Sequence, residues 1–224
     1  LWAQSYDRGP DPSYPGTRAT PTIDGQRIYT YGSAGDLCCR ELADGKLVWD
    51  AHGNVLLVNL TEKLLVPLLA KFSNFIPGAG IWLNTQRPEW NDANNALVGN
   101  GVSMVTLYYM RRHLTFCRDL FRSQTNTRFS VSSEIAQFFR AITRILKEHR
   151  SLLDGKINDR DRKRVLDALG RIGGNYRQQF YARRLSGRNE PITVRQLVDF
   201  LDLALDWTNH SIRANRHLLR GSAP

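Results

Sequence analysis

Residues 132–153 read SSEIAQFFRAITRILKEHRSLL, and this stretch decides the fold class. Apolar residues recur every three or four positions from Ile135 to Leu146, so they share one face of a helix. Ser132 and Ser133 are N-cap candidates, and Glu134 would stabilise the positive end of the helix dipole. The stretch therefore predicts an amphipathic helix that packs against other helices.

The flanking sequence contains further helical segments. Helices are expected at residues 61–75, 101–122, 158–170, 174–184 and 193–214. The first has Thr61 as its expected N-cap and contains Pro67, which should kink it. The stretch LGRIGGN predicts the end of one helix and a turn, because Gly170, Gly173 and Gly174 suit such positions. Long helices joined by polar loops predict a mainly α fold, a helical array.

Two of these segments carry additional detail. Residues 101–122 are apolar and aromatic enough to predict a mostly buried helix. Residues 193–214 begin with Thr193, an N-cap candidate, and continue with a broad apolar stripe that includes Trp207. Both segments are therefore expected to contribute to the core.

The N-terminal part has a different pattern. Residues 17–50 read TRATPTIDGQRIYTYGSAGDLCCRELADGKLVWD, with Asp-Gly pairs between strand-like runs. Such pairs favour tight turns, so an antiparallel β-meander is expected, with strands at 27–31, 36–41 and 46–49. Residues 1–50 contain five basic and seven acidic residues, whereas residues 51–224 contain 26 basic and 14 acidic ones. This break predicts two domains, 1–50 and 51–224.

Composition narrows the range of partners. The formal charge is +10, but many cations lie close to acids, as in the run around Asp159, Asp161 and Asp167. A solvated surface is therefore expected around these residues. Arg140, Arg144 and Lys147 also share a helix face, but nucleic acid is not the expected partner. No apolar run reaches the roughly 18 residues that a membrane span needs, so no membrane partner is expected.

Cysteine usage bears on cofactors and compartment. The three cysteines form neither a disulfide framework nor a metal-ligand pattern, so we expect no metal and no cofactor. They favour a reducing compartment, in which case the helical part would be cytoplasmic. The oligomeric state is left open by the sequence.

Residues 87–99, RPEWNDANNALVG, form the main candidate site. One interpretation is structural, with Asp92, Asn94 or Asn95 capping the next helix and Trp90 anchoring the core. The other is catalytic, because glycosidic bond cleavage needs an acid to protonate the leaving oxygen. A carboxyl beside an indole has a raised pKa and holds a proton near neutrality. Trp90 also offers a flat face for a sugar ring.

The stretch EWNDANN resembles the DWNDGMN loop of the cellobiose phosphorylase-like glycosidases and phosphorylases, whose catalytic domain is an (α/α)6 barrel. The resemblance implies that Asp92 is the general acid. It also places Trp90, Asn91 and Asn95 at motif positions that contact the substrate. Glu89 replaces an Asp, and we expect it to support the site or contact the sugar. The implied partner is a carbohydrate, together with phosphate if the enzyme is a phosphorylase.

The resemblance extends over residues 54–216, where DLALDWTNHSIRANR at 202–216 also looks like part of this class. Ala93 and Asn94 depart from the family's Gly-Met. His113 and His210 are further candidates for polar contacts in a sugar cleft. About six helices are expected where a full barrel has twelve, so residues 51–224 are expected to be a partial catalytic domain.

Residues 17–50 resemble one blade of a PQQ-like β-propeller, through the pattern ATPTxDG…GxL…GKxxW. A single blade has no neighbours to cover its two faces, so it is not expected to act as a propeller. This leaves an alternative to the enzyme hypothesis. The chain would then be a non-enzymatic interaction or scaffold protein made of a propeller-type segment and a helical bundle, or an inactive fragment.

Overall fold

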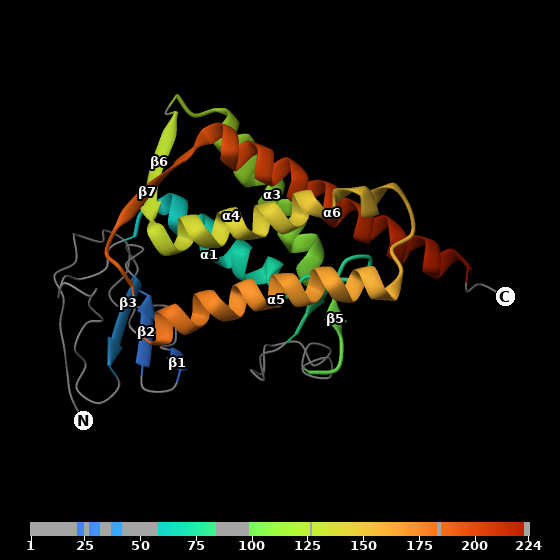
Figure 1. Cartoon of the computed structure of the whole chain (residues 1–224), viewed down its shortest axis with the longest axis horizontal. Helices are drawn as coiled ribbons and strands as arrows, with labels where there is room; N and C mark the ends of the chain where they lie inside the picture. Colours follow the sequence, from blue (N-terminus) through green and yellow to red (C-terminus); the bar gives the residue numbers. More distant parts are fainter. Residues whose placement is uncertain are drawn as a thin grey trace, which may run out of the picture. The chain divides into compact units, whose positions relative to one another are not determined.

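The computed structural model describes residues 22–24, 27–31, 37–41, 58–83, 99–125, 127–182 and 185–221 (Figure 1). The chain divides into two compact units, residues 1–57 and residues 58–224. The second unit is mainly helical and also contains small antiparallel sheets. This confirms the prediction of a mainly α fold.

The first unit contains an antiparallel sheet with strand order β1-β2-β3. Its strands are Thr22–Asp24 (β1), Arg27–Tyr31 (β2) and Leu37–Glu41 (β3). Asp24 pairs with Arg27, so the turn between β1 and β2 is tight, as the Asp-Gly pair predicts. Strands β2 and β3 match the strands expected at 27–31 and 36–41, whereas β1 was not among the expected strands. The third expected strand, residues 46–49, lies outside the described residues.

The second unit contains five α-helices within its described residues. They are α1 (Leu60–Phe72), α3 (Met104–Arg122), α4 (Ser133–Glu148), α5 (Asp159–Tyr181) and α6 (Val194–Gly221). A 3₁₀-helix, η1 (Arg150–Asp154), follows α4. The strands are β4 (Ile81–Trp82), β5 (Val102–Ser103), β6 (Arg128–Ser132) and β7 (Asn189–Thr193). Among the described helices, none has both the length and the apolar character needed to cross a lipid bilayer.

Helix α1 begins two residues earlier than its predicted N-cap implies. Asn59, not Thr61, is the N-cap, and its side chain accepts a hydrogen bond from the Glu62 amide at 3.0 Å. Thr61 is instead buried in the first turn. Pro67 lies inside α1 on its exposed side, and the helix continues beyond it to Phe72.

Helix α3 is less buried than predicted. One face carries Leu107 and Leu114, which are completely buried, whereas the opposite face exposes Val105, Tyr109 and Phe116. The apolar content of this segment therefore reflects two apolar faces, only one of which packs within the described part of the chain.

Helix α5 corrects the prediction of two helices separated by a glycine turn. It runs without a break from Asp159 to Tyr181, with Gly170, Gly173 and Gly174 inside it. A Cβ atom at Gly173 would lie 2.4 Å from the Cβ of Ser73, at the end of α1. Glycine is thus needed here because α1 and α5 cross closely, and not because the helix ends.

Strands β6 and β7 form an antiparallel ribbon that the sequence interpretation did not include. Each strand leads directly into a helix, β6 into α4 and β7 into α6. Thr193, the predicted N-cap, accepts a hydrogen bond from the Gln196 amide at 3.1 Å, and Gln196 accepts one from the Thr193 amide at 2.9 Å. This reciprocal capping box fixes the start of α6.

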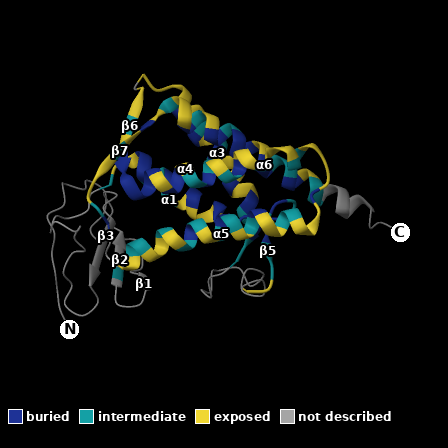
Figure 2. Ribbon diagram, in the orientation of Figure 1, coloured by how far each residue is buried: buried dark blue, intermediate teal, exposed yellow. Residues whose placement is uncertain are grey.

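The core lies between α1, α3, α4 and α6, and Figure 2 shows the buried residues gathered along one side of each helix. Phe139 of α4 and Phe72 of α1 both pack on Phe200 of α6, with ring centroids 5.0 and 6.1 Å apart. The fully buried Trp207 packs on Phe75 and donates a hydrogen bond from Nε1 to the Leu146 carbonyl at 3.1 Å. Aromatic packing therefore joins helices from distant parts of the sequence.

Candidate functional site

The predicted site residues Glu89, Trp90, Asn91, Asp92 and Asn95 lie between residues 83 and 99, outside the described residues. The structure does describe the two ends of this stretch. The Gly99 amide donates to the Leu83 carbonyl at 2.8 Å, and the Leu83 amide donates to the Gly101 carbonyl at 3.2 Å. Strands β4 and β5 continue this pairing through Trp82 and Val102. The predicted site therefore connects two paired strands.

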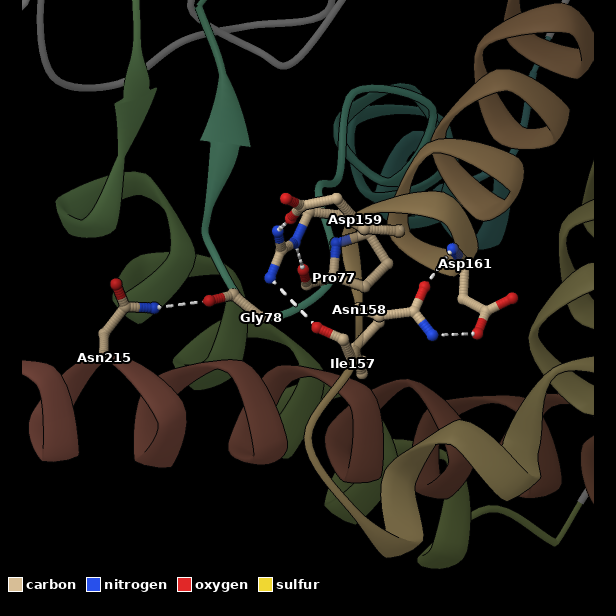
Figure 3. A network of polar contacts seen from close by, with 8 residues as sticks. Pro77, Gly78, Ile157, Asn158, Asp159, Asp161 and Asn215 are labelled. Atoms are coloured by element: carbon tan, nitrogen blue, oxygen red, sulfur yellow. Dashed lines mark hydrogen bonds and ion pairs between the residues drawn. The ribbon is translucent and has the colours of Figure 1, made fainter.

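The turn before β4 is held by the second sequence motif, residues 202–216. Gly78 has φ of +73°, a left-handed conformation that favours glycine. Its amide donates to Ser211 Oγ at 2.9 Å. Asn215 Nδ2 donates to the Gly78 carbonyl at 3.1 Å (Figure 3) and to the Ala79 carbonyl at 2.9 Å. Two polar residues of α6 thus fix the backbone that leads into β4.

Arg162 binds the same turn from α5. Its Nε donates to the Pro77 carbonyl at 2.9 Å and its Nη2 to the Ile157 carbonyl at 3.2 Å (Figure 3). Arg162 also pairs with Asp159, and Asn158 caps α5 by accepting from the Asp161 amide at 2.8 Å. The start of α5, the turn and α6 are therefore joined by one polar network.

A cavity of about 440 Å³ lies between η1 and α6. Its lining is almost entirely polar: Arg150, Ser151, Leu153, Asp154, Asp206, Asn209 and Arg213. The three α6 residues occur at spacings of three and four, so they share one face of the helix. Ser211 and Asn215 lie on the opposite face of α6, which contacts the turn before β4.

Several cavity side chains have a fixed orientation. Arg150 forms an ion pair with Asp206 at 3.2 Å, and Arg111 of α3 donates from Nε to Asn209 Oδ1 at 2.7 Å. The second bond uses only the oxygen of Asn209, so within the described part of the chain its two amide hydrogens can contact another group. The cavity therefore presents oriented donors and acceptors together.

The two predicted histidines have different surroundings. His113 Nε2 lies 3.3 Å from the Leu64 carbonyl and 3.5 Å from Cys117 Sγ, inside the helical packing. Burial raises the pKa of Cys117 to about 11, so the thiol stays protonated and this Cys–His pair is not an activated nucleophile. His210 Nε2 lies 2.9 Å from the Gly155 carbonyl, next to the cavity. His210 thus ties the residues after η1 to α6.

The basic face predicted on α4 lines a second hollow, of about 300 Å³. Its lining is Phe139, Arg140, Thr143, Arg144, Lys147, Glu148, Gln196 and Asp199. Arg140 pairs with Glu190, and its hydrogen bond lowers the pKa of that carboxyl. Acids are thus interspersed with the cations, which is the arrangement expected of a solvated surface.

Among the described residues, two carboxylates are buried; Glu62 was not selected from the sequence, and Glu134 was expected only to stabilise the helix dipole. Glu62 is 2% exposed and accepts hydrogen bonds from the amide and hydroxyl of Ser132. Glu134 is 7% exposed and accepts one from the Ser186 amide at 2.7 Å. Burial, and then these two charges, raise the pKa of Tyr176 to about 12. Each acid lies in the first turn of its helix. This position is the signal from which its role in binding backbone amides of neighbouring segments could have been inferred.

Comparisons with known proteins give no assignment. No protein-family model matches the chain, and a search of the curated proteins finds no match. Function must therefore be argued from the residues and the geometry described above.

Proposed function

We propose that the chain is a carbohydrate-active protein that cleaves a glycosidic bond by general acid catalysis, with Asp92 as the acid. The observation that carries this proposal is the EWNDANN stretch at 89–95. Support comes from the paired strands at its two ends and from α6, whose Ser211 and Asn215 bind the turn that leads into β4. The two stretches that resemble the same enzyme class are thus connected through β4.

In the proposed reaction, Asp92 protonates the oxygen of the leaving sugar as the glycosidic bond breaks. Trp90 raises the pKa of this carboxyl by excluding water and stacks on a sugar ring. Glu89, Asn91 and Asn95 bind hydroxyl groups, because carboxylates and amides match their donors and acceptors. The attacking nucleophile is water in a hydrolase and phosphate in a phosphorylase. We further propose that the five helices correspond to part of an (α/α)6 barrel.

The proposal is tested with a panel of β-linked disaccharides, assayed with and without phosphate. Asp92→Asn keeps the size of the side chain but removes the acid, and we expect a loss of turnover of at least about 100-fold. Asp167→Asn is the matched control, since Asp167 is exposed on α5 and its partner among the described residues is Lys163. If the wild-type chain turns over none of the disaccharides, or if Asp92→Asn retains full turnover, the enzymatic proposal is wrong.

A specific observation favours the alternative of a non-enzymatic interaction protein. On α3, Val105, Tyr109 and Phe116 are 56%, 64% and 57% exposed and share one face. The Arg112 guanidinium lies 6.0 Å from the Tyr109 ring centroid, within the same stripe. An apolar stripe of this kind is typical of an association surface.

Light scattering tests this alternative. A self-associating chain should become monomeric when Tyr109 and Phe116 are both replaced by Ser, with an unchanged circular dichroism spectrum. A wild-type chain that is already monomeric at high concentration would contradict self-association through this face.

A further inference from the structure

We propose that the cavity between η1 and α6 binds a neutral monosaccharide unit. The choice of carbohydrate rests on the proposed function, but none of the residues that define the site belongs to the 89–95 stretch. It is defined by the cavity of about 440 Å³ and by the polar side chains that line it. This volume lies in the range of small-molecule sites, about 300–1,000 Å³.

The chemistry of the lining matches the hydroxyl groups of a sugar. Each hydroxyl both donates and accepts, so a sugar site needs donors and acceptors side by side. The cavity supplies acceptors from Asp154 and Asp206, and donors from Asn209 and Arg213. Leu153 adds an apolar contact, which suits the C–H face of a pyranose ring.

Some of the lining side chains already have partners that orient them. Arg111 holds Asn209 by its oxygen, so the amide hydrogens remain available, and Arg150 holds Asp206. His210 ties Gly155, the residue after Asp154, to α6. Preorganised groups lose little conformational freedom on binding, which increases affinity.

The charge balance favours a neutral ligand. Two guanidinium groups, Arg150 and Arg213, face two carboxylates, Asp154 and Asp206. These four charges cancel, so the cavity has no net attraction for an anion such as phosphate or for a metal cation. A neutral hydroxylated ring can instead form hydrogen bonds with both kinds of group.

Isothermal titration calorimetry with methyl β-glucoside, methyl β-galactoside and methyl β-mannoside tests the site. We expect saturable binding of at least one glycoside to the wild-type chain. Asp154→Asn and Asn209→Asp keep side-chain size but alter the hydrogen bonding, and each should weaken binding about tenfold or more. Asp167→Asn, on the exposed side of α5, should leave binding unchanged.

A second comparison separates this inference from the proposed reaction. Asp92→Asn should lose turnover but bind the glycoside as the wild type does. A wild-type chain without turnover that still binds the glycoside would refute the enzymatic proposal and leave the cavity site standing. The site is refuted if no glycoside binds, if Asp154→Asn and Asn209→Asp bind normally, or if only inorganic phosphate binds.

Discussion

The close crossing of α1 and α5 at Gly173 gives the sharpest stability prediction. A Cβ atom at this position would lie 2.4 Å from Ser73 Cβ and 2.5 Å from Ser73 Oγ. Carbon atoms in contact normally lie about 3.5–4.0 Å apart, so the two helices must separate by about 1 Å. Ser73 is 3% exposed and cannot move its Cβ by changing rotamer. Overpacking of this kind costs about 1–3 kcal/mol.

Gly174 is the matched control for this change. A Cβ atom at Gly174 meets nothing within 4 Å, and the residue lies in the same helix. Ala is favoured over Gly in a helix interior by about 0.8–1.0 kcal/mol, a gain that applies to both positions. We therefore expect Gly174→Ala to stabilise the chain by about 1 kcal/mol. Gly173→Ala should be less stable than Gly174→Ala by about 1–3 kcal/mol, which is a net loss of up to about 2 kcal/mol relative to the wild type.

Urea denaturation followed by circular dichroism measures both variants, and the midpoint of Gly173→Ala should lie below that of Gly174→Ala. Ser73→Gly removes both clashing atoms, so the double variant with Gly173→Ala should recover most of the loss. A Gly173→Ala variant as stable as Gly174→Ala would refute the close crossing. Equal destabilisation of both would instead mean that glycine itself is needed in this part of α5.

Three further predictions concern Cys117, which is buried, and Tyr176 and Asn215, which are partly buried. Cys117, whose pKa is raised to about 11, should resist alkylation at about pH 8 in a Cys38→Ser, Cys39→Ser background and react once guanidinium chloride unfolds the chain. Tyr176 should stabilise the fold below pH 10, and this contribution should be lost as the pH rises towards about 12, because the unfolded tyrosine ionises first. Urea titrations of wild type and Tyr176→Phe at several pH values measure the difference between their free energies of unfolding. The change of this difference with pH should vanish if Tyr176 titrates normally. Asn215→Ala should cost about 1–3 kcal/mol, and hydrogen exchange should show faster exchange at Trp82 and Leu83.

Helix positions could be predicted wherever the apolar periodicity was strong. The segments that became α4 and α6 were recognised because their apolar residues recur at helical spacing. Thr193 caps α6 as predicted, whereas Ser132 occupies the N-cap position of α4 without a capping hydrogen bond and its hydroxyl donates to Glu62. The break predicted within α5 was wrong because a glycine pair indicates either a helix end or a close crossing. The sequence alone does not separate these two causes, since Ser73 is about 100 residues away.

The β6–β7 ribbon was missed for a related reason. Its pairs, such as Phe129 with Ile192, join segments separated by two helices, so no hairpin turn marks them. The η1–α6 cavity is similar, since Asp154 and Asn209 meet only when the chain has folded. Local patterns predict elements, whereas sites built from distant elements require the packing itself.

The stretch DWTNHSIRANR shows how one helix serves three purposes. Trp207 lies in the core and bonds to the Leu146 carbonyl, whereas Ser211 and Asn215, four and eight residues later, bind the turn before β4. Asn209 and Arg213 face the cavity from the opposite side. Because these spacings follow the helical period, core, turn and cavity are aligned by a single rigid element. The order of residues in this motif thus has a structural reason. The motif links the cavity to β4, the strand that precedes residues 84–98.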